Sequence, residues 1–181
     1  MNYATLRQQA KTGDILAVKG TGFIGGLIRA LTGESYSHVA LLVWDDGGLM
    51  VYEFVEGTGY QAMPASEWLR RRTGQRVHYG IAPRIVGQYQ TLVAQAARRY
   101  RNSSVAARWY GWFSLPKVWF SQLIGRRIPV RQKVCSTFVQ ECWQAGKYAG
   151  LRNSSADPGS IVSHCDVLHK LTTPKGTGPL S

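Results

Sequence analysis

The chain has 181 residues, of which 44% are hydrophobic and 18% are charged. This balance excludes wholesale disorder, and the length suits one domain. No apolar run approaches the ~20 residues that a membrane span needs. Residues 1–7 also lack the basic start and apolar stretch of a secretory signal. We therefore expect the protein to be cytoplasmic at synthesis, and its release would need lysis, a phage particle or a secretion system.

The positive charge is concentrated in the middle of the chain. The formal net charge is +12, to which residues 1–65 contribute −2, residues 66–133 contribute +13 and residues 134–181 contribute +1. The middle segment also holds tryptophans and phenylalanines between residues 109 and 120. Basic and aromatic side chains together suit an anionic membrane surface, an anionic polymer such as cell-wall material, or nucleic acid. Nucleic acid is the least favoured because its usual binding motifs are absent, and a solvated helix face over core aromatics is the alternative.

The expected elements mix helices with strands. Residues 2–11 predict a helix, 13–18 a strand and 20–33 an amphipathic helix. Two β-rich runs, 37–44 and 49–55, flank a hairpin turn, and a helix follows Pro64. The remaining elements are a strand at 76–81, helices at 84–100, 104–124 and 134–146, with Gly146 closing the last, and a turn at 157–159. We expect an α+β fold in one domain over 1–170, with a flexible tail at 171–181.

Cys135 begins the helix expected over 134–146 and shares a face with positions 138, 139 and 142. The unpaired N–H groups and the dipole of a first helical turn favour a thiolate there. The backbone N–H groups of Cys135 and Ser136 could also hold an oxyanion. A buried structural cysteine is the alternative for Cys135, and it is our interpretation of Cys142 and Cys165. The odd number of cysteines makes a disulfide framework unexpected.

His38 lies in a run that is apolar on both alternating faces, which predicts a central strand covered on both sides. An ionisable ring in that position needs a partner. If the hairpin turn is centred on Asp46 and Gly47, paired residue numbers sum to 93, and Glu53 becomes a diagonal neighbour of His38 on the same face. A carboxylate that orients an imidazole beside a thiol would complete a nucleophile, base and orienting group. A buried His–Glu pair without chemistry is the alternative, and the other histidines are interpreted as structural or solvent-facing.

Four short motifs in this order resemble the circularly permuted papain-like thiol hydrolases of the NlpC superfamily, in their YaeF/YiiX branch. Lecithin retinol acyltransferase is a more distant relative. The motifs are Gly13-Asp14-Ile15, Tyr36-Ser37-His38-Val39-Ala40, Tyr52-Glu53 and Cys135-Ser136, and a Pro-Gly segment at 158–159 follows the cysteine helix. The histidine strand precedes the cysteine helix in that group, the reverse of papain's order, as it does here. The resemblance covers about residues 12–57 and 132–165, and residues 66–133 match nothing in it.

The resemblance implies a papain-like fold in which an antiparallel sheet packs against the cysteine helix. It implies Cys135 as nucleophile, His38 as general base and Glu53 as orienting residue, without a metal or organic cofactor. The implied activity is an amidase or peptidase acting on an amide bond, cell-wall peptides included, with segment 66–133 shaping the choice of a peptide, cell-wall or lipid-like substrate. Two alternatives stay open: a lipid acyltransferase or thioesterase-type acyl hydrolase, and a basic membrane or cell-wall binding protein without turnover.

Overall fold

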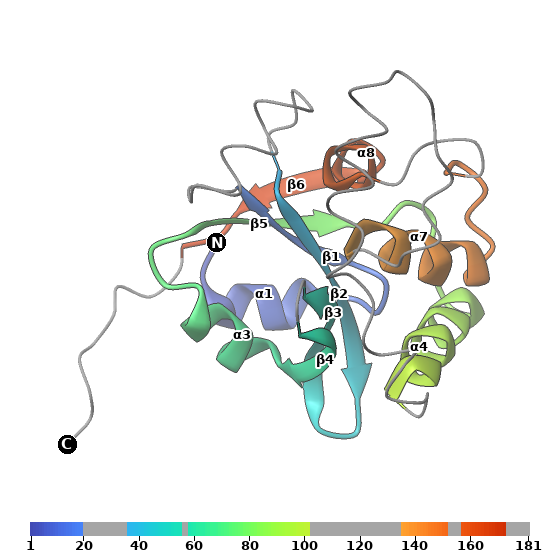
Figure 1. The fold of residues 1–181 in the computed structure, drawn as a ribbon, viewed down its shortest axis with the longest axis horizontal. Coiled ribbons are helices and arrows are strands. Elements are labelled where there is room, and N and C mark those ends of the chain that lie inside the picture. Colours follow the sequence, from blue (N-terminus) through green and yellow to red (C-terminus); the bar gives the residue numbers. More distant parts are fainter. Residues whose placement is uncertain (20–35, 56–57, 102–134, 152–156, 173–181) are drawn as a thin grey trace.

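The structure is a computed structural model that describes residues 1–19, 36–55, 58–101, 135–151 and 157–172. These residues form a mixed α+β fold, with a six-stranded antiparallel sheet in the order β4-β3-β2-β1-β5-β6 (Figure 1). The strands are β1 (Ile15–Lys19), β2 (His38–Asp45), β3 (Gly48–Val55), β4 (Gly59–Pro64), β5 (Arg76–Ile81) and β6 (Val167–Lys170). The helices are α1 (Tyr3–Gln9), α3 (Ala65–Arg71), α4 (Gln88–Arg101), α7 (Cys135–Ala145) and α8 (Pro158–Ser163). The expected α+β class is confirmed.

Strand β2 is central and buried on both faces, as its sequence predicts. Alternate residues of a strand point to opposite faces, so the two sides of β2 enter two different cores. Figure 1 shows α4, α7 and α8 on one side of the sheet and α1 and α3 on the other. On the first side Val39, Leu41 and Val43 pack with residues of α4, α7 and α8. On the second side Ala40 and Leu42 pack with residues of α1 and α3.

The β2–β3 hairpin has the expected register. Leu41 lies opposite Tyr52 and Asp45 lies opposite Gly48, so paired numbers sum to 93. The residue with left-handed geometry is Gly48, with φ of 102°, rather than either residue of the two-residue turn. A glycine adopts this conformation without the steric penalty of a Cβ atom.

Several expected boundaries are wrong. The helix expected from residue 84 begins at Gln88, because Arg84 and Gly87 have positive φ values of 51° and 56°. Asp157-Pro158-Gly159 is not a turn but the start of α8, since the Asp157 side chain caps it by accepting a bond from the Ser160 N–H. Strands β4 and β6 are additions to the expected set, because their short, mixed sequences carry weak strand signals.

Gly146 has a different role from the one expected. The left-handed residue after α7 is Lys147, with φ of 64°. A Cβ atom on Gly146 would lie 2.6 Å from a side-chain carbon of Val93 in α4. Gly146 therefore permits the close approach of α4 and α7 rather than a left-handed cap.

The end of the described chain is tied to the sheet. Leu171 is buried, and its N–H donates to the carbonyl of Val77, while the N–H of Thr172 donates to the carbonyl of Met1. These two residues are the first of the expected tail, and residues 173–181 lie outside the described residues. The helices expected at 20–33 and 104–124 also lie outside them. No helix in the described ranges is long and apolar enough to span a membrane.

Candidate functional site

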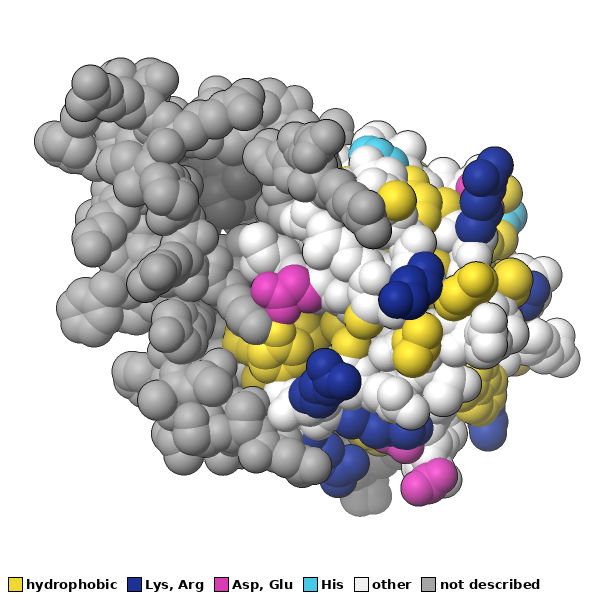
Figure 2. Space-filling model, turned by 90° about the vertical axis from the view of Figure 1, so that its right-hand side faces the viewer, with side chains coloured by type: hydrophobic (Ala, Val, Ile, Leu, Met, Phe, Trp, Pro, Cys, Tyr) yellow, Lys and Arg dark blue, Asp and Glu magenta, His cyan; other side chains and the backbone are white. Residues whose placement is uncertain are grey.

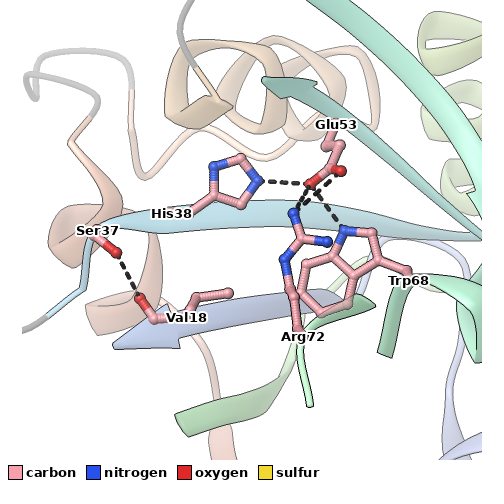
Figure 3. Close-up of polar contacts among 6 residues, drawn as sticks. All are labelled: Val18, Ser37, His38, Glu53, Trp68 and Arg72. Carbon is pink, nitrogen blue, oxygen red and sulfur yellow. Dashed lines mark hydrogen bonds and ion pairs between the residues drawn. The ribbon is translucent and has the colours of Figure 1, made fainter. Parts of the chain in front are cut away.

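His38 and Glu53 meet at the open end of the β2–β3 hairpin. The Nε2 atom of His38 lies 2.6 Å from Oε2 of Glu53 (Figure 3). Two bonds to the Val18 carbonyl, from the N–H and the hydroxyl of Ser37, hold the chain just before His38 against β1. The pairing expected from the hairpin register is therefore present, and His38 keeps 20% of its side-chain surface exposed.

Glu53 is held by more groups than His38 alone. Its side chain is 1% exposed, and an ionised carboxylate in that position needs compensation. The indole N–H of Trp68 donates to Oε2 at 2.8 Å, and a guanidinium nitrogen of Arg72 lies 3.0 Å from Oε2 and 3.2 Å from Oε1. Both residues come from α3 and the turn after it (Figure 3). The guanidinium carbon of Arg72 also lies 3.8 Å from the Trp68 ring centroid, a cation–π contact.

Cys135 reaches His38 from the other layer. It is the first residue of α7, whose apolar face, with Phe138, Val139 and Trp143, packs on the side of the sheet opposite α3. Its sulfur is hydrogen-bonded with His38 and accepts bonds from the backbone N–H groups of Val39 and Ser136. Because Nε2 of His38 is occupied by Glu53, Nδ1 is the nitrogen left for the thiol.

The electrostatics of these groups favour a charged pair. Burial alone raises the pKa of Cys135, but the charge and hydrogen bond of His38 and the two backbone N–H groups outweigh it and hold that pKa below its ordinary value. Burial alone lowers the pKa of His38, but the Cys135 thiolate and Glu53 raise it to about 9. For Glu53, burial raises the pKa, and contacts with His38, Arg72 and Trp68 bring it below the ordinary range. The charged forms of Cys135 and His38 thus stabilise each other.

The structure brings Cys135, His38 and Glu53 together, with the N–H of Ser136 beside the sulfur. Sequence reasoning did not identify Trp68 and Arg72, which it assigned to a basic, aromatic segment without individual roles. The available signal was their spacing of four residues, which places them on one side of the same helical turn. That signal could not distinguish Arg72 from its neighbours Arg70 and Arg71, which bond to Glu67 instead.

The remaining histidines and cysteines have other contacts. His78 of β5 packs edge-on against Tyr36, and His169 of β6 stacks on Tyr79. None of the three cysteines forms a disulfide. Cys142 is fully buried in the core, and burial raises the pKa of Cys165 to about 12. No group of three or more His, Cys, Asp and Glu side chains in the described part of the chain is placed to hold a metal ion.

The described basic residues are partly neutralised within the fold. Figure 2 shows Lys and Arg side chains distributed among hydrophobic ones on the face that carries α4 and α7. Four of the arginines between residues 70 and 98 pair with carboxylates, namely Arg70 and Arg71 with Glu67, Arg72 with Glu53 and Arg98 with Asp45. The aromatic residues between 109 and 120 lie outside the described residues.

Comparisons with known proteins give a limited result. No family model matches the chain, and no curated protein does so. Among the solved structures, the chain is similar to one titled as the metalloprotein YiiX from Escherichia coli O157:H7. The two share 16% sequence identity over 92% of this chain and 98% of that chain, with a TM-score of 0.47. A likeness of this strength assigns neither a family nor an activity.

Proposed function

We propose that this protein is a thiol hydrolase with a permuted papain-like arrangement, in which Cys135 is the nucleophile, His38 the general base and acid, and Glu53 the orienting residue. The observation that supports it is the contact chain from Cys135 through His38 to Glu53, in which each ionisable group has a partner that favours its charged state. A purely structural cysteine gains nothing from a lowered pKa, whereas a nucleophile does.

The proposed reaction is hydrolysis of an amide bond through an acyl-enzyme. The Cys135 thiolate attacks the carbonyl carbon, and the negative charge moves to the carbonyl oxygen, near the N–H groups of Cys135 and Ser136. The C–N bond then breaks as the His38 imidazolium gives its proton to the leaving nitrogen. Neutral His38 next takes a proton from water, whose oxygen attacks the thioester. The C–S bond breaks, the carboxylic product leaves, and the thiolate–imidazolium pair is restored.

Amidase or peptidase activity, cell-wall peptides included, is the preferred form of the proposal. Purified protein would be assayed against fluorogenic peptide amides, soluble cell-wall peptides and short-chain and long-chain acyl esters. We expect amide cleavage that is lost in Cys135→Ala and His38→Ala and retained in Cys142→Ala, the matched cysteine control. Cleavage of long-chain esters alone would favour an acyl hydrolase, and amide cleavage that survives Cys135→Ala would refute the proposed nucleophile.

A further inference from the structure

The carboxylate proposed to orient His38 is itself bound to a cation. Oε2 of Glu53 accepts bonds from three donors, His38, Trp68 and Arg72, and Oε1 accepts from Arg72 as well. The Arg72 side chain is only 16% exposed, and its guanidinium carbon lies over the buried Trp68 ring. This cation is therefore a fixed part of the site rather than one of the solvated surface arginines.

We propose that Arg72 is a positioning residue of this site, and that it neutralises Glu53 so that the two together orient His38 as a neutral hydrogen-bonding unit instead of an anion. The inference rests on the proposed function, because it assigns a role within that site. A carboxylate alone would both aim the imidazole and bind its proton strongly. With Arg72 in contact, Glu53 still orients the ring, but the positive charge of Arg72 opposes the rise in the His38 pKa that Glu53 causes.

Neutralising Glu53 would help His38 act as an acid. The His38 proton must be released to the leaving nitrogen during each turnover, and an imidazolium held too strongly is a poor acid. The thiolate of Cys135 already stabilises the imidazolium. A second uncompensated anion would raise its pKa further from the working pH, so a neutral orienting unit suits the acid and base steps better.

The charged groups around this unit are few among the described residues. Cys135 faces His38 from α7, and Glu53 faces it from β3. Arg72 faces Glu53 from the turn after α3. Arg71, next to Arg72 in the chain, also acts on it electrostatically. Lys19 of β1 lies over the Tyr36 ring, with its nitrogen 5.3 Å from the ring centroid. The effect of Arg72 on His38 can therefore be isolated by removing one charge at a time.

The size of the effect follows from the two contacts. The Arg72 nitrogen is 3.0 Å from Oε2 of Glu53, and that oxygen is 2.6 Å from Nε2 of His38. Laid end to end, these contacts put the Arg72 nitrogen within about 5.6 Å of the imidazole nitrogen. At an effective dielectric constant of about 20 to 40, a unit charge at that distance shifts a pKa by about one to two units.

The test is an NMR titration of the His38 ring in the Cys135→Ala protein, where no thiolate contributes. We expect Arg72→Met to raise the His38 pKa by about one to two units. Arg70→Met, which also removes one arginine but at a side chain 72% exposed and bonded to Glu67, should leave it unchanged. Glu53→Gln should lower the His38 pKa, and Glu53→Gln with Arg72→Met should return it close to that of the Cys135→Ala parent.

Equal shifts in Arg72→Met and Arg70→Met would overturn the inference. If Arg72→Met alone fails to fold, the comparison of Glu53→Gln with the double variant measures the same charge, and no rise between them would also overturn it. Because Cys135 is absent throughout, the outcome is independent of turnover. An absence of hydrolysis would refute the proposed function and leave this result standing. If hydrolysis is found, Arg72→Met should move the alkaline limb of its pH profile upward, an effect that a purely structural role would not produce.

Discussion

Replacing Glu53 with glutamine tests how strongly the site is built into the fold. Glutamine matches the size of glutamate, but its amide has one acceptor oxygen and one donor nitrogen. If the amide oxygen keeps the three contacts of Oε2, the new NH₂ group takes the place of Oε1. In the wild type, Oε1 accepts a bond from Arg72 at 3.2 Å. Two donors then face each other, and the partly buried Arg72 cation loses its counter-charge.

The expected loss of stability is large for a single, nearly isosteric change. Removing one partner of a buried ion pair typically costs about 3 to 5 kcal/mol. Glu53 is 1% exposed and Arg72 is 16% exposed, so water can reach the arginine in part. We therefore expect a loss at the low end of this range, about 3 kcal/mol. The free energy of unfolding of a typical domain is roughly 5 to 15 kcal/mol.

The measurement is urea unfolding followed by tryptophan fluorescence and circular dichroism at pH 7. Glu67→Gln is the matched control, because Glu67 also binds two arginines but lies at the surface, and its substitution should give no resolvable change. A loss below about 1 kcal/mol for Glu53→Gln would refute the buried-pair reasoning. Adding Arg72→Met to Glu53→Gln should restore part of the loss, since the unpaired cation is then removed.

The same pair predicts a dependence on pH. The folded-state pKa of Glu53 lies below its ordinary value of 4.5, because contacts with His38 and Arg72 outweigh burial. A carboxyl whose pKa is lowered by folding contributes stability above its unfolded pKa and loses that contribution as the pH falls through the folded value. The difference in stability between the wild type and Glu53→Gln should therefore be complete above about pH 4.5 and shrink below it.

Three further outcomes follow from the packing. Gly146→Ala should destabilise the protein by about 1 to 3 kcal/mol in thermal unfolding, because its Cβ would lie 2.6 Å from Val93, and adding Val93→Ala should make the two changes less than additive. Cys165 should resist alkylation at pH 8, measured by mass spectrometry, because burial raises its pKa to about 12, and labelling as fast as that of Cys135 would contradict this. Asp14→Ala should destabilise by about 2 to 4 kcal/mol in urea unfolding, because two backbone N–H groups and a tyrosine hydroxyl lose a buried acceptor, and a loss under about 1 kcal/mol would refute this role.

The sequence carries the central hairpin and the cysteine helix clearly because their signals are local. Apolar runs on both sides of a compact turn define β2 and β3, and the register in which paired numbers sum to 93 keeps His38 and Glu53 on one face. The contact between Cys135 and His38 joins two residues with 96 others between them. Spacing alone could not predict it, and its expectation came from the family resemblance. The structure adds the physical reason, which is that α7 packs across β2 and directs its first residue toward His38.

Other features depended on tertiary contacts that no local pattern encodes. Arg70, Arg71 and Arg72 carry the same charge and follow one another in the sequence. Of the three, Arg72 pairs with the buried Glu53 and lies over the Trp68 ring. The position of Gly146 after a helix predicts a cap. Its actual constraint is Val93 of α4, which leaves no room for a Cβ atom there. In both cases the residue type was informative, but its partner lay on another element.

The pH dependence of iodoacetamide alkylation at each cysteine, measured by mass spectrometry in wild type and His38→Ala, tests the central proposal most directly. The proposal predicts that Cys135 reacts rapidly well below pH 9, the ordinary pKa of its thiol, and that His38→Ala shifts this reactivity to higher pH. Cys142 and Cys165 should remain unreactive in both proteins. If Cys135 titrates as an ordinary thiol, or reacts identically without His38, the thiolate–imidazolium site is refuted.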